Sequence, residues 1–384
     1  MNTRIPVGIA VNGVTGRMGY RQHLVRSLLA IREQGGVARA DGSVIWPELT
    51  LVGRNAEKLA AIAHRHGIDR YRTTLSDVLA DENITVYFDA LTTNQRVACV
   101  QEAIAAGKHV YCEKPIATTV DQSRDLVRAA ESAGVKNGVV ADKLYLPGLR
   151  KLKRLIDSAF FGRILSVRGE FGYWVFEGDW QSGQRPSWNY RAEDGGGMAL
   201  DMFPHWNYVL ENLIAPVKSV YAQVKTHVPQ RFDESNAAYD VTADDAAYAI
   251  FELEDGTIAQ INSSWTTRVF RDELVEFHVD GTHGSAVAGL RRCRAQHRTA
   301  TPKPVWNPDI PEIADFRSQW SEVPDNDDFD NGFKAQWEEF LLHVVDDTPW
   351  RHDFRSAHRG VAVARAGYES SRNGHKVEIG PPRS

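Results

Sequence analysis

The sequence predicts a two-domain protein, with an α/β domain over residues 1–145 and an α+β domain over residues 146–384 that has an open-faced, mainly antiparallel sheet. Two observations carry this prediction. Up to about residue 145, short β-branched runs alternate with segments of helical period, which is typical of a parallel sheet covered by helices. After Pro147 the runs become longer and alternate between apolar and polar residues, which is typical of antiparallel strands with one exposed face.

In the first domain, strands and helices are predicted in strict alternation. The glycine that ends several of the helical segments is a common helix stop. The predicted strands are residues 7–11, 49–52, 84–91, 108–112 and 138–141, and the predicted helices are residues 17–33, 56–67, 95–107 and 119–134.

The second domain begins with a predicted helix at residues 149–162. Asp255-Gly256 and Asp280-Gly281 are hairpin turn signals within two of the strand runs. A proline-rich loop at residues 298–316 precedes two terminal helices, which are free to pack back on the first domain. The alternating runs are residues 164–176, 217–228, 245–265 and 273–289, and the terminal helices are residues 331–345 and 354–374.

Composition excludes several classes of function. The net charge of -5 gives no reason to expect a nucleic-acid or anionic-membrane partner. Cys99, Cys112 and Cys293 lie far apart, which favours reduced thiols over a disulfide framework or a thiolate metal site, and we predict no metal site. No apolar run approaches the about 20 residues that cross a bilayer, and a strand begins too early for a signal peptide. We therefore expect a soluble, cytoplasmic protein.

The loop "NGVTGRMGY" lies between the first strand and the first helix, where a dinucleotide fold binds pyrophosphate at a helix N-terminus. Its three glycines suit a tight turn, close approach to phosphate, and helix–strand packing. Thr15 stands where the usual second glycine of the fingerprint would be, so a glycine turn without a ligand is the alternative. A Rossmann domain that binds NAD or NADP is the better interpretation. The predicted contacts are Gly13, Thr15, Gly16, Arg17, Met18 and Gly19.

The choice between the two cofactors stays open. NAD enzymes tend to place an acidic residue after the second strand to hold the ribose hydroxyl. Here that strand ends in "VGRN", so Arg54 stands where the acid is expected. Its guanidinium could accommodate a 2′-phosphate or stack on the adenine.

A second cluster follows three glycines at residues 195–197. Asp201 and His205 are four residues apart on the helix that opens there, so both side chains are predicted on one face. An aspartate beside a histidine can fix the imidazole tautomer and raise its basicity. The alternative is an ordinary pair on a helix surface.

With "AGKHVYCEKPIA", "LPGLRKLKRLIDSAFFGRILSVRGEF" and "GGGMALDMFPH" in that order, the chain resembles the Gfo/Idh/MocA (glucose–fructose oxidoreductase / inositol dehydrogenase) family. The resemblance spans essentially the whole chain. It implies a Rossmann domain, an open-faced sheet domain, and a sheet face that is buried in a homodimer or homotetramer.

The resemblance also implies site residues. Lys114 lies beside substrate and nicotinamide, and Asp201 and His205 complete a triad that handles protons. Pro115 fixes the turn, in some relatives through a cis bond, and Glu113 makes a cofactor or backbone contact. An exposed salt bridge between Lys114 and Glu113 is the alternative.

Two segments depart from the family pattern. "ADKLYLPG" replaces the usual arginine or asparagine cluster, so Asp142, Lys143 and Tyr145 are candidates for that edge of the substrate site. "LTTN" replaces the usual cofactor loop, which makes Thr92 and Asn94 cofactor candidates.

The segment at residues 171–191 is rich in tryptophan, tyrosine and arginine, a combination that holds sugars through ring faces and polar groups. Trp188, Tyr190 and Arg191 are the first substrate candidates because they lie nearest the catalytic helix in sequence. Packing in the core or at a subunit interface is the alternative for several of these rings.

Three functions follow. The first is an NAD(P)-dependent oxidoreductase that acts on a ring secondary hydroxyl of a sugar or glycoside. The second is an NAD-dependent glycoside hydrolase that oxidises C3 transiently, with Tyr145, Tyr190 or His205 as the base near C2. The third is a non-catalytic regulator that senses the cofactor, against which Lys114, Asp201 and His205 count.

Overall fold

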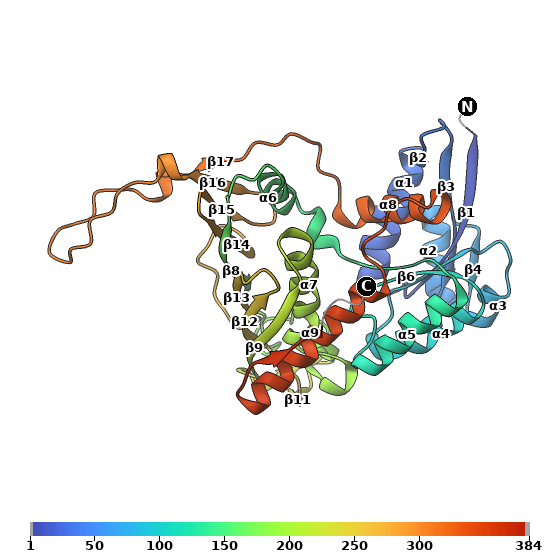
Figure 1. Cartoon of the computed structure of the whole chain (residues 1–384). Coiled ribbons are helices and arrows are strands. Elements are labelled where there is room, and N and C mark those ends of the chain that lie inside the picture. The colour runs from blue at the N-terminus through green and yellow to red at the C-terminus, as the bar shows by residue number, and fades with distance from the viewer. Residues whose placement is uncertain (1–2, 381–384) are drawn as a thin grey trace.

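The structure is a computed structural model that describes residues 3–380. Two domains lie side by side, with the first domain in blue to green and the second sheet in green to brown (Figure 1). The first sheet has the order β2-β3-β1-β5-β6-β7, with β4 also paired to β3; β2 is antiparallel and the other pairs are parallel. Its strands are β1 (Arg4–Asn12), β2 (Val37–Ala38), β3 (Val44–Val52), β4 (Arg70–Arg72), β5 (Val86–Asp89), β6 (His109–Cys112) and β7 (Asn137–Val139).

Helices cover both faces of this sheet, because its strands are apolar on both sides. The strand order reverses beside β1, whose neighbours are β3 and β5, and such a reversal opens a crevice at the carboxyl ends of the strands. The helices of the first domain are η1 (Met18–Leu29), α1 (Ala30–Glu33), α2 (Ala56–His66), α3 (Leu75–Leu79), α4 (Thr93–Ala105) and α5 (Val120–Ala133).

Two predicted elements of this domain differ from the structure. The first helix is a π-helix over η1 before it becomes α-helical, and the Ser27 hydroxyl donates to the Gln22 carbonyl five residues earlier, at 2.7 Å. The second strand begins at Val44 rather than at residue 49, because the start of β3 pairs with β2 in a hairpin.

The second domain contains a nine-stranded sheet in the order β17-β16-β15-β14-β8-β13-β12-β9-β18. Only the β8–β13 pair is parallel, so the predicted mainly antiparallel sheet is confirmed. Its strands are β8 (Ile164–Gly172), β9 (Val217–Lys225), β12 (Ala246–Leu253), β13 (Ile258–Ser264), β14 (Val275–Gly281), β15 (Gly284–Ala288), β16 (Cys293–His297), β17 (Ser321–Glu322) and β18 (Val377–Glu378), and a separate pair is β10 (Gln230–Phe232) with β11 (Ala238–Asp240).

One predicted turn of this sheet is wrong by a residue or two. Gly281 is still within β14 and pairs with Ile164 at a register shift, so Thr282 and His283 make the turn into β15. The Asp255-Gly256 turn lies between β12 and β13 as predicted, with Gly256 at a φ of +84°.

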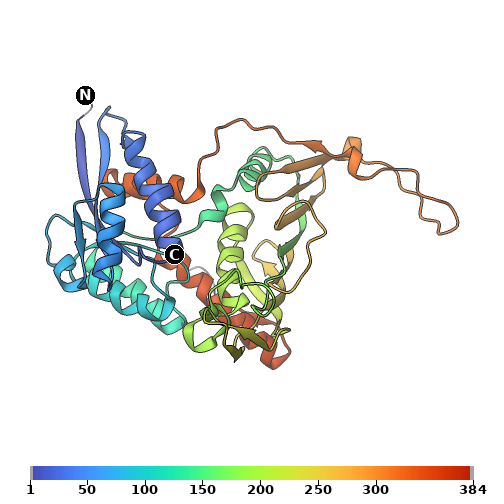
Figure 2. The same cartoon turned by 180° about the vertical axis from the view of Figure 1, so that it is seen from behind.

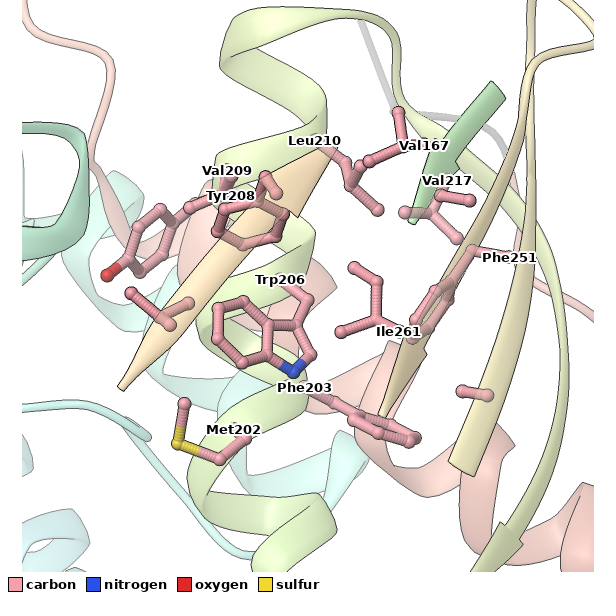
Figure 3. Close-up of a cluster of buried hydrophobic side chains, with 14 of the residues drawn as sticks. Val167, Met202, Phe203, Trp206, Tyr208, Val209, Leu210, Val217, Phe251 and Ile261 are labelled. Atoms are coloured by element: carbon pink, nitrogen blue, oxygen red, sulfur yellow. The ribbon is translucent and has the colours of Figure 1, made fainter. Parts of the chain in front are cut away.

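Helix α7 (Met198–Leu213) packs along one face of this sheet, and α6 (Pro147–Asp157) covers its other end. Figure 3 shows Phe203 and Trp206 of α7 in one buried cluster with Phe251 and Ile261 of the strands. The Trp206 indole N–H donates to the Ser263 hydroxyl at 2.9 Å, which satisfies the polar atom of a fully buried ring. This packing fixes the helix that carries Asp201 and His205.

Two C-terminal helices connect the domains. In α8 (Gly332–Asp346), Trp337, Phe340 and Leu341 enter the core of the first domain. In α9 (Phe354–Asn373), Phe354 belongs to a core of the first domain and Val363 to the core of the second. The first domain is therefore built from two distant parts of the chain.

A long loop over residues 298–320 joins β16 to β17 and projects away from the body of the molecule, as Figures 1 and 2 show from opposite sides. Residues 298–316 form the predicted proline-rich loop. Across residues 3–380, no helix has the length and apolar character to span a membrane.

Candidate active site

A cavity of about 480 Å³ lies between the domains, at the carboxyl edge of the first sheet. The segments that follow β1, β5 and β6 form most of its first-domain wall, and residues from the end of β8 into the first half of α7 form the opposite wall. Ligands of doubly wound sheets bind at this edge.

The glycine loop is shaped to receive a pyrophosphate. Gly13 has a φ of +80°, and a Cβ there would meet the Ala90 carbonyl carbon at 2.7 Å. A Cβ on Gly19 would meet the Gly13 oxygen at 2.4 Å, so the first turn of η1 lies directly on the loop. Gly16 is exposed in the cavity wall, where its backbone can approach a phosphate.

A buried polar chain holds this loop to the rest of the edge. The Asn12 amide donates to the Tyr87 hydroxyl at 2.7 Å, which donates to Asp89 at 2.8 Å. The Arg96 guanidinium binds Asp89 at 3.2 Å and donates to the carbonyl of Pro115. Because this series of hydrogen bonds runs from the end of β1 to the turn after β6, it fixes the cofactor loop relative to Lys114.

Lys114 lines the cavity and directly precedes a cis Lys114–Pro115 bond. Its ammonium group forms an ion pair with the Asp201 carboxylate and donates to the Asp201 carbonyl at 3.2 Å. The sequence alternative, a salt bridge with Glu113, is wrong: of that pair, only the Lys114 backbone N–H contacts the Glu113 carboxylate, at 3.2 Å.

Arg185 is a second cation at Asp201, with Nη1 3.2 Å from the other carboxylate oxygen. The same guanidinium donates to Asn189 and to the Tyr173 hydroxyl, each at 3.2 Å, and lies over the Trp265 ring at 4.3 Å. Burial acts to raise the pKa of Asp201, but Lys114 and Arg185 outweigh it and lower the pKa from 3.8 to about 2. Asp201 is therefore an ionised anchor for two cations.

The predicted contact between Asp201 and His205 does not form, because Asp201 is taken up by the two cations. The His205 Nδ1 instead lies 2.5 Å from the Tyr208 hydroxyl, and 4.0 Å from Asp142. Lys143 pairs with the other oxygen of Asp142 at 2.7 Å. Burial, and then the nearby charge of Lys114 and the other cations, lowers the pKa of His205 well below 6.5, so the imidazole is neutral at neutral pH.

Glu113 is fixed from behind the cavity. The Trp337 indole N–H donates to Nδ1 of His23 at 3.0 Å, which leaves Nε2–H of His23 to donate to Glu113 at 2.9 Å. Burial alone would raise the pKa of Glu113, but the bond from His23 and the charge of Lys114 lower it. The carboxylate is ionised in the cavity wall and oriented by η1 and α8.

The structure divides the predicted substrate residues. Lys143 and Trp188 line the cavity. Tyr145, Tyr190 and Arg191 do not belong to its wall, because each side chain is engaged elsewhere: the Tyr145 hydroxyl donates to Glu339 at 2.6 Å, Tyr190 is buried under the Arg231 guanidinium at 4.2 Å, and Arg191 lies over the Tyr239 ring at 4.7 Å.

The predicted cofactor residues are divided in the same way. Gly16, Arg17, Met18, Thr92 and Glu113 line the cavity, whereas Gly13 and Gly19 support the loop from beneath. Thr15 and Arg54 are exposed outside the wall, Arg54 in the turn between β3 and α2, and Asn94 donates to the Glu193 carbonyl at 2.5 Å across the domain boundary.

Several site residues were not predicted. Tyr208 follows His205 by three residues on the same helix, and this spacing was a usable signal. Asn189 had a weaker signal, its place beside Trp188. Arg96 and Phe333 had none, because the contacts of Arg96 are made through the fold and Phe333 reaches the cavity from α8.

The fold and the cavity define a class of protein. A doubly wound sheet with a glycine loop at a helix N-terminus suits a dinucleotide, and Gly16 of this loop, Thr92 and Glu113 line one cavity. A lysine, an ionised aspartate and a neutral histidine line the same cavity, a combination suited to proton transfer. These features together define a dinucleotide-dependent oxidoreductase.

Comparison with known proteins identifies the family. Residues 7–140 match the model of an oxidoreductase family with an NAD-binding Rossmann fold, and residues 149–287 match a GFO/IDH/MocA C-terminal domain. The chain belongs to the Gfo/Idh/MocA family of oxidoreductases, and the predicted family, fold and NAD-binding domain are confirmed.

Two curated relatives and one solved structure illustrate the similarity. A D-xylose dehydrogenase of Paenarthrobacter nicotinovorans is 57% identical over 377 residues, which are 97% of each chain. A levoglucosan dehydrogenase of Pseudarthrobacter phenanthrenivorans is 26% identical over 270 residues, 64% of this chain and 67% of the relative. A levoglucosan dehydrogenase structure with NADH and levoglucosan has a TM-score of 0.78 at 19% identity, covering 98% of this chain and all of that one.

Proposed function

We propose that the chain is an NAD(P)-dependent dehydrogenase of a pyranose sugar, with D-xylose as the first candidate. The observation that carries this proposal is the cluster at the cavity, in which Asp201 holds Lys114 and Arg185 beside a neutral His205. The D-xylose dehydrogenase of Paenarthrobacter nicotinovorans, similar over nearly its whole length, supports the choice of sugar.

His205 is the proposed base. Asp142 is an acceptor beside Tyr208, so the Tyr208 hydroxyl donates toward Asp142 and accepts from Nδ1–H of His205. This tautomer leaves Nε2 without a proton and able to accept one from a sugar hydroxyl. The lowered pKa keeps it in that form at neutral pH.

Lys114 is the proposed electrophilic partner of the same hydroxyl oxygen. Its ammonium group is oriented by Asp201 and has three N–H donors, of which two are used by that residue. The remaining donor can stabilise negative charge as the hydroxyl oxygen loses its proton. When bound, the nicotinamide supplies the acceptor for the hydride that leaves the carbon bearing this hydroxyl.

The sugar ring is positioned mainly by the second-domain wall, together with Lys143 from the end of the first domain. Trp188 and Tyr173 offer ring surface to the C–H bonds of a pyranose, and Asn189 and Lys143 offer polar groups to its hydroxyls. In an aldopentose, oxidation of the C1 hydroxyl gives a lactone, so the product distinguishes C1 from the other ring carbons.

The test is a two-channel assay with NAD and NADP on free aldoses and aryl glycosides. One channel follows absorbance of the reduced nicotinamide, and the other follows release of the aglycone. We expect D-xylose to reduce the cofactor, and His205→Ala to abolish the signal. No reduction with any free sugar would overturn the proposal, and aglycone release without net reduction would support the glycosidase.

The structure does not favour the glycosidase. The glycosidase mechanism needs a second base near C2 of the sugar. Of the three residues predicted for this role, Tyr145 and Tyr190 are engaged outside the cavity wall. His205 alone of the three lines the cavity.

We also propose that the chain forms a homo-oligomer. The outward face of the nine-stranded sheet carries partly exposed apolar side chains, Tyr248 and Ile250 on β12 and Ile258 on β13, at exposures of 40%, 46% and 43%. A face of this kind is typical of an interface between subunits. Sedimentation velocity at micromolar concentration tests this proposal, and a monomer would overturn it.

A further inference from the structure

The loop over residues 301–316, here called the arm, exposes apolar side chains far from the rest of the chain. Trp306 is 98% exposed and Ile313 is 94% exposed. Figures 1 and 2, which view the molecule from opposite sides, both show the arm extending away from the body of the molecule. Large apolar groups exposed together on a projecting segment mark an interaction surface. Val305, Ile310 and Phe316 add to it, at exposures of 50%, 53% and 45%.

The arm is stiffened in its projecting form. Residues 301–316 contain four prolines, at positions 302, 304, 308 and 311, which restrict the backbone to extended conformations. Glu312 joins the two limbs, because its carboxylate accepts from the backbone N–H of Val305 at 2.9 Å and of Ala314 at 3.0 Å. A prestiffened segment loses less conformational entropy when it binds.

The base of the arm is anchored on the open sheet. Strands β16 and β17 pair through Arg294 with Glu322 and Ala295 with Ser321. Trp320, at the foot of the arm, packs edge-on against His278 of β14, with ring centroids 5.4 Å apart. The arm therefore continues the sheet that carries the exposed apolar residues.

This continuity with the sheet favours a second copy of the chain as the partner that the arm contacts. A second copy that covers the sheet face would lie within the about 25 Å that an eight-residue extended limb can span. Each copy would contribute one arm and one apolar face. A pair related by a two-fold axis would therefore bury both arms and both faces in one interface. A single arm of 16 residues is smaller than the 20–30 residues per side of a stable interface, and the sheet face supplies the remainder.

We infer that residues 301–316 form an intersubunit arm that buries Trp306 and Ile313 against a second copy of this chain. The inference rests on the proposed self-association and goes beyond it, because it assigns a segment that reaches across the interface. The central role of the two residues follows from their size and full exposure, since buried aromatic and aliphatic anchors dominate interface affinity.

The first experiment compares the oligomeric state of the full chain with that of Trp306→Ser combined with Ile313→Ser. Tyr71→Ser, a partly exposed aromatic on β4 of the first domain, is the matched control. Sedimentation velocity across protein concentrations should show self-association at least a hundredfold weaker in the arm variant and unchanged in the control. Both substitutions lie on exposed side chains, so the fold is retained, and circular dichroism checks it.

The second experiment replaces Trp306 by a photoreactive benzoylphenylalanine in the full chain. Illumination should give a covalent dimer whose cross-linked peptide lies in the other copy. If the wild type is an oligomer but gives no such cross-link, the proposed role of the arm is overturned and the self-association stands. The same holds if the arm variant associates like the wild type. A monomeric wild-type chain would overturn both the arm and the self-association on which it rests.

Discussion

Tyr208 provides the sharpest test of the proposed base. Tyr208→Phe removes the hydroxyl 2.5 Å from Nδ1 of His205 and keeps the ring, which packs in the second-domain core. The change leaves the imidazole N–H without its partner in a buried site, at a cost of about 1–3 kcal/mol. At about 1.4 kcal/mol per tenfold in rate, we expect kcat to fall roughly 5- to 150-fold.

The KM for the sugar should change by less than about twofold, because Tyr208 does not belong to the cavity wall. The assay follows the reduced nicotinamide at saturating cofactor, across sugar concentrations, and a pH series records the acid limb of kcat. Tyr111→Phe is the control, since Tyr111 is also fully buried and its hydroxyl has no hydrogen-bond partner within residues 3–380. A Tyr208→Phe enzyme with wild-type kcat and pH profile would show that the base acts without this tyrosine.

Three further predictions follow from the same site. Because burial and then the nearby cations lower the pKa of His205, its base form is present throughout the neutral range, and kcat/KM for oxidation should show no loss on going from pH 8 to pH 6.5. Lys143→Met removes one of those cations and raises the pKa of His205, so the acid limb of the pH profile should move to higher pH. In Arg185→Lys the charge remains but the contacts to Asp201, Asn189 and Tyr173 cannot all be kept, so kcat/KM should fall about tenfold or more by the same assay, whereas Arg191→Lys, outside the cavity wall, should match the wild type. Arg54→Asp places an acid after β3, and the ratio of kcat/KM with NAD to that with NADP should rise at least about tenfold; an unchanged ratio would mean that Arg54 does not face the ribose.

Local sequence signals predicted the fold class and the centre of the site. Lys114 follows a strand in a distinctive motif, and the glycines before α7 mark where Asp201 and His205 begin a helix. These features depend on a few neighbouring residues, so one sequence is enough to find them. The same local reading placed Tyr190 in the substrate site because it lies near the catalytic helix, yet its ring points into the core beneath Arg231.

The partners of the site residues could not be predicted in this way. Asp201 and His205 have the spacing of a helical pair, but Arg185 and Lys114 reach Asp201 from segments 16 and 87 residues away. Two cations outcompete one neutral imidazole for a carboxylate, and only the fold brings them there. His23 orients Glu113 over a separation of 90 residues, and Trp337 orients His23 over a separation of 314 residues, for which the sequence offers no local pattern.

The return of α8 to the first domain affects the order in which the protein can be made. Trp337, Phe340 and Leu341 complete an apolar core whose other members lie almost entirely within the first 140 residues. On a ribosome that core stays open until nearly the whole chain has emerged, so the N-terminal domain cannot mature ahead of the second one. A fragment of residues 1–145 should accordingly bind a hydrophobic dye and unfold without a sharp transition, whereas a cooperative melt of that fragment would show that α8 only covers a finished domain.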